Sequence, residues 1–286
     1  MKENRSRAAI RLAAFKRLAM WHVLSGPLNL VLVTEFPKAG GSWFCQMLAE
    51  AAELPFPRNV APRLEPCVMH GHHLPRAHFG KTVGIVRDGR DIAVSAYFHF
   101  LFENERNSPF SVRRHRARCG FDDYADVRGN LPAFIDYLFG AYARERTGFT
   151  WSEFGRACRE REHVHLVRYE DVLTDPASAV GDTLAFLGRT APSAEAIAAV
   201  VARNSFAAQR AALTPASDGF PSFLRRGVAG DWKNHFSAEA RVVFARHGGS
   251  ELEALKYEVD DSWVGKAVEP GHRDDFRSEG ATRATG

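Results

Sequence analysis

An apolar run, a glycine-containing loop and a helical pattern follow one another between residues 28 and 54. The run Leu-Asn-Leu-Val-Leu-Val-Thr at 28–34 has the length and the β-branched content of a buried strand in a parallel sheet. The loop after it contains two glycines, which let a backbone bend tightly and approach a ligand closely. Because the N–H groups at the start of a helix favour negative charge, this segment predicts an oxyanion site between a strand and a helix.

The same order of strand, polar loop and helix occurs twice more along the chain. Residues 81–86 form an apolar run, and a helical pattern follows at 91–102. Residues 163–168 form a third apolar run, and a helical pattern follows at 176–187. Repetition of this unit predicts an α/β fold with a mostly parallel central sheet. Elsewhere we expect helical segments at 131–160 and 193–202, an irregular segment at 103–130 and a loop at 207–222.

Length and composition predict one main domain. The chain has 286 residues, near the upper limit for a single core, and we assign residues 28–265 to that domain. Residues 1–27 form a basic segment with a helical pattern, and residues 266–286 are polar enough to form a disordered tail. The N-terminal segment lacks the roughly 20 apolar residues of a transmembrane span, which leaves packing on the domain or weak contact with a membrane surface.

Charge and cysteine content narrow the partners and the compartment. The formal net charge is +4, which suits an anionic ligand, although many basic proteins bind none, and we expect no nucleic acid partner. The four cysteines are widely spaced and form no CxxC pair. We therefore expect reduced thiols and a cytoplasmic location.

The loop Pro37-Lys38-Ala39-Gly40-Gly41-Ser42-Trp43 carries the chemistry of the first unit. Lys38 adds a mobile positive charge and Ser42 adds a hydroxyl to the backbone N–H groups. The lysine precedes the glycines, so the loop is not a Walker sequence, and the dinucleotide pattern Gly-x-Gly-x-x-Gly is absent from it. Alone, the loop predicts an anion cradle or a tight turn with an incidental lysine.

Two further segments suggest a second anion. Arg87 ends the second apolar run, where ligands bind in open α/β sheets, and Ser95 lies on the helix that follows. The planar guanidinium of an arginine donates two parallel hydrogen bonds to a phosphate. We expect Arg90 and Asp91 to form a surface salt-bridge cluster instead. A third candidate is the run Phe-Leu-Arg-Arg-Gly-Val-Ala-Gly-Asp-Trp-Lys-Asn-His-Phe at 223–236.

Together, these segments resemble the sulfotransferases that use 3′-phosphoadenylyl sulfate (PAPS). The resemblance implies a three-layer, P-loop-like α/β fold with a mostly parallel central sheet flanked by helices. The resemblance runs from about residue 28 to residue 236 and implies that Lys38 holds the bridging and sulfuryl oxygens of this co-substrate. Gly41 departs from the family's loop, which has a threonine there, but its N–H group is expected to remain available to the 5′-phosphate. The donor-binding residues implied by the resemblance are Lys38, Ala39, Gly40, Gly41, Ser42, Trp43, Arg87, Ser95, Tyr169, Ser205, Phe206, Arg225, Arg226 and Gly227. The adenine would be surrounded by Trp43, Tyr169, Ser205 and Phe206. The 3′-phosphate would be bound by Arg87, Ser95 and the Arg225–Gly227 segment.

The general base is expected among three histidines in Met-His-Gly-His-His-Leu-Pro at 69–75. Alignment of Leu-Pro on the family's Lys-Thr-His-Leu-Pro motif gives His73 the catalytic role beside Lys38, and Gly71 takes the place of the motif's lysine. Whether His70 or His72 assists or replaces His73 stays open. Three clustered histidines also suit a metal, but no nearby Cys or Glu completes an obvious site and the expected fold requires no metal, so we expect none.

The predicted reaction is in-line transfer of the sulfuryl group from PAPS to a hydroxyl or amine, releasing 3′,5′-ADP. The acceptor is expected to be a small molecule or a glycan. A protein that binds the nucleotide without turnover is the main alternative, and a P-loop kinase is a weaker one. Residues 233–242 depart from the family's dimer segment, so the oligomeric state stays open.

Overall fold

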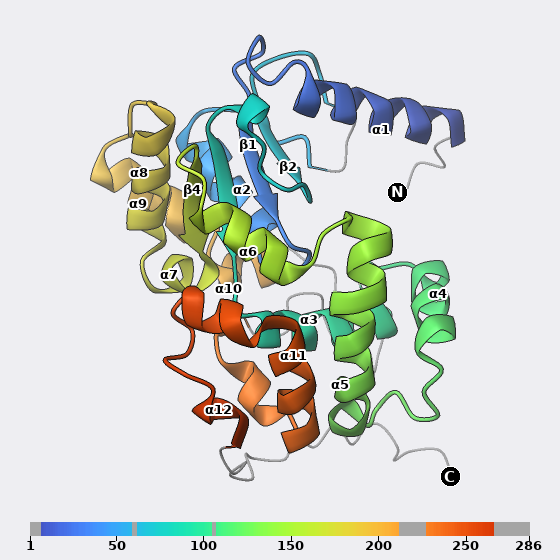
Figure 1. Cartoon of the computed structure of the whole chain (residues 1–286). Helices are drawn as coiled ribbons and strands as arrows, with labels where there is room; N and C mark the ends of the chain where they lie inside the picture. Colours follow the sequence, from blue (N-terminus) through green and yellow to red (C-terminus); the bar gives the residue numbers. More distant parts are fainter. Residues whose placement is uncertain (1–6, 59–61, 105–106, 212–226, 266–286) are drawn as a thin grey trace, which may run out of the picture.

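A computed structural model describes residues 7–58, 62–104, 107–211 and 227–265 of the chain. Its centre is a sheet of four parallel strands in the order β2-β1-β3-β4 (Figure 1). In the register of this sheet, Val33 of β1 lies opposite His70 of β2 and Val83 of β3. The strands are β1 (Val31–Glu35), β2 (Val68–Gly71), β3 (Thr82–Val86) and β4 (Val164–Arg168).

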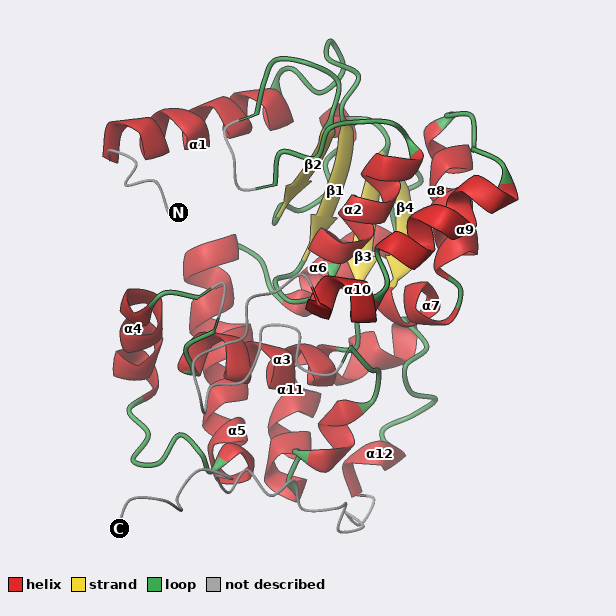
Figure 2. Ribbon diagram, turned by 180° about the vertical axis from the view of Figure 1, so that it is seen from behind, coloured by secondary structure: helices red, strands yellow, loops and turns green. Residues whose placement is uncertain are grey.

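Helices cover the sheet and extend beyond the carboxyl ends of its strands. The α-helices are α1 (Arg7–His22), α2 (Gly41–Ala51), α3 (Gly89–Leu101), α4 (Pro109–Cys119), α5 (Val127–Asp136), α6 (Trp151–Arg159), α7 (Tyr169–Thr174), α8 (Pro176–Leu187), α9 (Ala194–Arg203), α10 (Phe206–Ala211), α11 (Ala238–Ala254) and α12 (Ser262–Gly265). Three segments of other helical types are η1 (Ala77–Phe79), the π-helical η2 (Tyr137–Thr147) and η3 (Asp231–Asn234). Helices α2, α8 and α9 pack together at the sheet, α6 contacts β4, and α3, α5 and α11 form a further helical layer (Figure 2). The predicted α/β fold class is confirmed.

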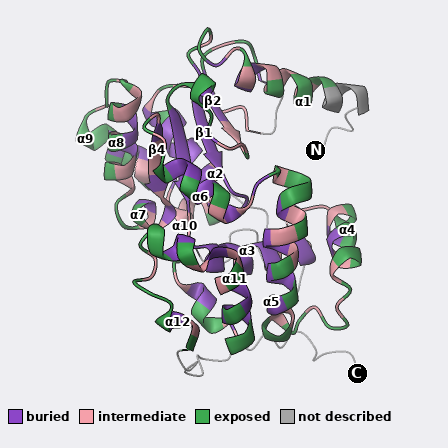
Figure 3. Cartoon of the chain, in the orientation of Figure 1, coloured by how far each residue is buried: buried purple, intermediate pink, exposed green. Residues whose placement is uncertain are grey.

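The buried residues form two apolar clusters. The larger joins the strands to α2, α3, α5, α6 and α11, and it includes Phe44, Tyr97 and Phe244. The smaller lies under the end of α1, where Met20 and Trp21 pack against β1, β2 and η1. Figure 3 shows the contrast between the buried strands and the exposed outer surfaces of the helices. Among the helices in the described ranges, none combines the length and the apolar character that crossing a membrane requires.

Three elements differ from the sequence-based prediction. The irregular segment expected at 103–130 contains α4, because the Ser108 hydroxyl accepts the Ser111 N–H, Pro109 occupies the first turn, and Gly120 ends the helix at φ 64°. Buried Val112 and His115 attach this arginine-rich helix to the protein. The prediction also missed β2, a four-residue edge strand. The loop expected at 207–222 begins as α10, and its remainder, like the expected tail at 266–286, lies outside the described residues.

Candidate active site

A cavity of about 380 Å³ lies beside the loop between β1 and α2. Residues from β1 to η3 meet there, although they are distant in the sequence. The lining residues are Pro37, Lys38, Gly40, Ser42, Trp43, Gln46, Arg58, His72, Arg87, Ser95, His99, Phe100, Tyr142, Tyr169, Leu173, Phe206, Gln209, Gly227, Val228 and Asp231. The cavity thus brings together nine of the predicted donor-binding residues: Lys38, Gly40, Ser42, Trp43, Arg87, Ser95, Tyr169, Phe206 and Gly227.

The loop adopts a conformation that depends on its glycine at position 40. Gly40 has φ 98°, and a Cβ atom there would lie 2.5 Å from a ring carbon of Tyr169. Lys38, which is not a glycine, also has a positive φ of 77°, a costly conformation of the kind that concentrates at functional sites. Burial and the neighbouring Arg87 lower the pKa of Lys38 to about 7, against the opposing effect of Glu35.

Two loop residues do not line the cavity. Ala39 is fully buried, and its N–H group donates to the Phe36 carbonyl at 3.2 Å. The Gly41 N–H donates to Glu35 Oε2 at 2.6 Å, so the expectation that it stays available to a phosphate is wrong for this structure. A Cβ at Gly41 would lie 2.8 Å from His70 Nε2 and 2.9 Å from the Glu35 carboxylate. The loss of the family's threonine at this position therefore makes room for Glu35 and His70.

Aromatic side chains form one end of the cavity. The Trp43 and Tyr169 ring centroids lie 6.0 Å apart at 70°, and the Trp43 indole N–H donates to the Asn204 carbonyl at 2.7 Å. Phe206 lines the cavity beside them. Ser205 is not among the lining residues; its hydroxyl accepts the Ala208 N–H at the start of α10.

A cationic site lies where β3 meets α3. The Arg87 guanidinium stacks on Tyr169 at 4.3 Å and donates to the carbonyls of Lys38 and Val228 at 3.3 and 3.4 Å. Its buried Nε–H has no hydrogen-bond partner among the described residues. Ser95 lines the same cavity. Arg225 and Arg226 lie outside the described residues.

Asp91 and Arg90 are buried, so the predicted surface salt-bridge cluster is wrong. The Asp91 carboxylate accepts the N–H groups of Gly230 and Trp232 at 2.6 and 2.9 Å, which fastens the segment after Gly227 to α3. Arg90 pairs with Asp88 at 2.7 Å and stacks on Trp232 at 3.8 Å. Both residues therefore support the cavity wall from behind.

The three histidines at 70–73 do not share one environment. Side chains alternate along an extended segment, so His70 and His72 point to one side and His73 to the other. The His73 ring lies 4.7 Å from Trp21 of α1 and does not line the cavity. Burial and nearby His22, His72 and Arg76 lower its pKa to about 4. The structure therefore separates His73 from the cavity, and His72 is the histidine of this motif that lines it.

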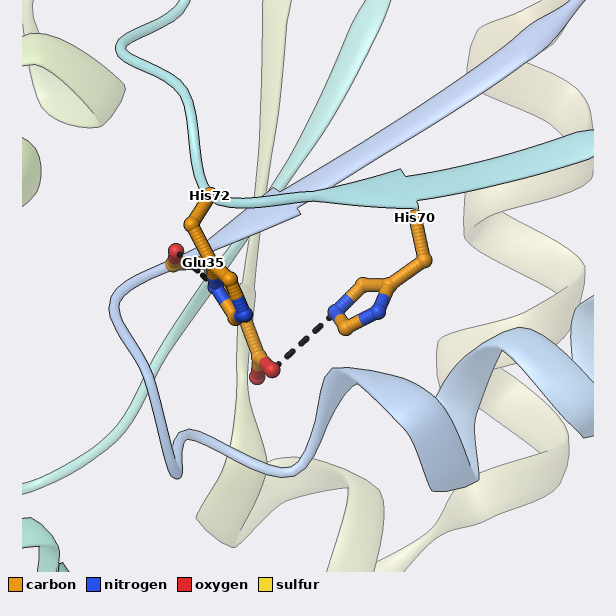
Figure 4. A group of neighbouring side chains, drawn as sticks. All are labelled: Glu35, His70 and His72. Carbon is orange, nitrogen blue, oxygen red and sulfur yellow. Dashed lines mark hydrogen bonds and ion pairs between the residues drawn. The ribbon is translucent and has the colours of Figure 1, made fainter. Parts of the chain in front are cut away.

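His72 has a defined tautomer. Its Nδ1 lies 3.1 Å from the Glu35 carbonyl oxygen, which can only accept, so Nδ1 carries the proton and Nε2 keeps its lone pair. Burial lowers the pKa of His72, which favours the neutral ring. His70 Nε2 lies 3.0 Å from Glu35 Oε1, and Figure 4 shows both rings converging on this glutamate. The pKa of Glu35 is lowered by His70, His72 and the Gly41 N–H, although burial opposes this, so its carboxylate is ionised.

Glu35 and several of the residues that line the cavity were not predicted. An acidic residue at the carboxyl end of an otherwise apolar strand was the available signal for Glu35. Beyond the donor-site residues, the lining includes Gln46, Arg58, His99, Phe100 and Tyr142. Their placement depends on tertiary contacts, such as the ring contact between Phe100 and Tyr142 at 5.0 Å.

Comparison with known proteins agrees with this geometry. The family model of the sulfotransferase domain matches residues 48–256, which is most of the chain, so the chain belongs to the sulfotransferase family. The enzymes of this family transfer a sulfuryl group from PAPS, and the predicted family is confirmed. The match begins within α2, downstream of the loop at 37–43.

Individual relatives are distant. Mouse sulfotransferase 2B1 is 27% identical over 203 residues, which cover 65% of this chain and 54% of that protein. Bovine sulfotransferase 1A1 is 24% identical over 271 residues, covering 79% of this chain and 84% of that one. The crystal structure of mouse sulfotransferase SULT7A1 with PAP aligns with a TM-score of 0.60 and 15% identity, covering 89% of this chain and 94% of that chain. The last comparison supports the fold alone.

Proposed function

We propose that this chain transfers the sulfuryl group of PAPS to the hydroxyl of a small, largely apolar acceptor, with His72 as the general base. The observation that carries the proposal is the defined tautomer of His72, whose unprotonated Nε2 belongs to a ring that lines the cavity. A neutral histidine with its other nitrogen anchored is suited to accept a proton. His73, the residue first predicted for this role, packs on Trp21 instead.

The donor would lie along the loop, with its adenine between Trp43, Tyr169 and Phe206. The Nε–H of Arg87, which has no hydrogen-bond partner in the described part of the chain, and the hydroxyl of Ser95 suit the 3′-phosphate. PAPS supplies the activated sulfur, since its 5′-phosphate is the leaving group. Lys38 would stabilise the negative charge that grows on the bridging oxygen, an electrostatic role for which the loop is already arranged.

The rest of the cavity would hold the acceptor. Phe100 and Tyr142 offer an apolar wall, and His99 is neutral because burial, with smaller effects from Lys38 and His115, lowers its pKa to about 2. A phenol or alicyclic alcohol that points its hydroxyl at His72 fits these residues better than an amine or a glycan. We propose a cytoplasmic location on the cysteine content alone.

A transfer assay tests the proposal directly. Purified protein is incubated with ³⁵S-labelled PAPS and panels of phenols, alcohols, amines and sugars. We expect labelled product from apolar hydroxyl acceptors, and His72→Gln should lower kcat by about 10²- to 10⁴-fold, the usual contribution of a general base. His73→Gln is the matched control, with activity close to the parent protein.

Three outcomes would overturn the proposal. Loss of activity in His73→Gln but not in His72→Gln would move the base role to His73. Tight binding of 3′,5′-ADP without transfer to any acceptor would favour the non-catalytic alternative. Stronger thermal stabilisation by ATP than by 3′,5′-ADP would favour a kinase.

A further inference from the structure

Glu35, His70 and His72 together resemble a set of metal ligands. They come from the end of β1, from β2 and from the residue after it, and each offers an oxygen or nitrogen atom within 4.8 Å of the other two (Figure 4). The sequence argument against a metal was that no nearby Cys or Glu completes an obvious site with the histidines. The parallel pairing of β1 with β2 supplies that carboxylate from 35 residues upstream.

Glu35 and His72 each have the atom that would not bind a metal already held by a hydrogen bond. The Gly41 N–H donates to Glu35 Oε2, which leaves Oε1 toward the histidines. The Glu35 carbonyl accepts from His72 Nδ1, which leaves the Nε2 lone pair. Metal-binding histidines and carboxylates in proteins are oriented by such outer hydrogen bonds, which also fix the tautomer of the ring. This outer shell makes the cluster more than a chance group of polar side chains.

The third donor needs only a change of proton. His70 Nε2 and Glu35 Oε1 form a hydrogen bond at 3.0 Å. A bound cation would replace the proton between these two atoms, which would pass to solvent, and the neutral His70 ring would then carry its proton on Nδ1. Two imidazole nitrogens and one carboxylate oxygen form the ligand set of many zinc sites, with bond lengths of about 2.0–2.2 Å. The cluster would contract slightly to reach such distances.

We propose that Glu35 Oε1, His70 Nε2 and His72 Nε2 bind a divalent zinc ion. Because His72 lines the cavity, the fourth coordination position would face the cavity and take a water molecule. A metal that occupies the His72 lone pair removes the base. Zinc is therefore an inhibitor of sulfuryl transfer, a consequence that depends on the proposed function, whereas binding itself does not.

Binding is measured on the full chain after treatment with EDTA and removal of the chelator. Titration calorimetry with Zn²⁺ should give one site per chain, and Co²⁺ should give the strong visible absorption of a four-coordinate ion. Each of Glu35→Gln, His70→Gln and His72→Gln should weaken Zn²⁺ binding by at least the 10- to 100-fold that loss of an outer-shell partner causes. His73→Gln, which alters the neighbouring histidine that faces α1, should leave affinity and stoichiometry unchanged.

The proposal fails if the parent chain binds no stoichiometric Zn²⁺, or if the three ligand variants bind it as the parent does. Should the buried Glu35→Gln variant not fold, the two histidine variants decide the question alone. Inhibition separates this idea from the proposed function. Zinc binding that depends on His72, without loss of transfer in His72→Gln, would reject the base assignment and keep the metal site. Loss of transfer in His72→Gln, in a protein that binds no zinc, would keep the base assignment and reject the metal site.

Discussion

The affinity of the donor site should fall as the pH rises above about 7, because Lys38 loses its proton in the free protein. Its pKa is lowered to about 7 by burial and by Arg87. Adjacent phosphates in the complex would return this pKa toward the ordinary lysine value of about 10.4. Binding in this window therefore takes up one proton, and linkage raises the Kd by about tenfold for each pH unit.

The measurement is the Kd of 3′,5′-ADP from pH 7 to pH 9 at constant ionic strength. The expected increase is about 100-fold at most, since two pH units separate the limits. The ligand adds little to this slope, because the second pKa of a phosphate is about 6 and its ionisation is largely complete by pH 7. Titrations in buffers of different ionisation enthalpy should also report proton uptake of up to one per site.

Lys38→Arg is the matched variant, because arginine keeps its charge throughout this range. Its Kd should be nearly constant from pH 7 to pH 9. The stability of the ligand-free protein should depend on pH in the opposite direction to the affinity. Between pH 7 and about 10.4, Lys38 is protonated in the unfolded chain but not in the folded one, so the unfolded chain binds more protons. The free energy of unfolding therefore rises with pH in this range. A constant Kd in the parent protein, or an equal slope in Lys38→Arg, would refute the reasoning.

Two further substitutions test the structure around the loop. Gly40→Ala should cost about 1–3 kcal/mol of stability and most of the 3′,5′-ADP affinity, because φ is 98° and the new methyl group would meet Tyr169; an unchanged melting temperature and Kd would contradict this. Asp91→Ala leaves the N–H groups of Gly230 and Trp232 without their acceptor, which should cost about 2–4 kcal/mol in urea unfolding and weaken 3′,5′-ADP binding. Asp91→Asn, which keeps one acceptor, should lose less, and equal losses in the two variants would argue against the hydrogen-bond explanation.

Local signals predicted the parts of the site that local structure builds. Strand, loop and helix are contiguous between residues 31 and 51, so the pattern of apolar residues and glycines was enough to predict the loop and Lys38. Arg87 followed from its place at the end of a strand. The same reasoning misjudged α4, where arginine-rich composition outweighed the signals of Ser108, Pro109 and Gly120, although those residues start and end helices.

The acceptor side of the cavity depends on contacts that no local pattern contains. Phe100 and Tyr142 meet through the packing of α3 against the segment after α5, and Arg58 reaches the cavity from a loop. Aromatic residues are plentiful between positions 97 and 124. Sequence alone does not separate the ones that fill the core, such as Tyr97, from the ones that face a ligand.

The assignment of the histidines shows why a motif must be combined with strand geometry. Alignment on Leu74-Pro75 selects His73, because the histidine of the family motif directly precedes its Leu-Pro pair. In an extended segment, alternate side chains point to opposite sides. His70 and His72 therefore share one side, and Gly71 and His73 face Trp21 on the other. The Glu35 carbonyl then fixes the proton on His72 Nδ1. The imidazole that lines the cavity therefore lies one residue before the position that the family motif selects, and the glycine at 41 leaves room for the Glu35–His70 pair beside it.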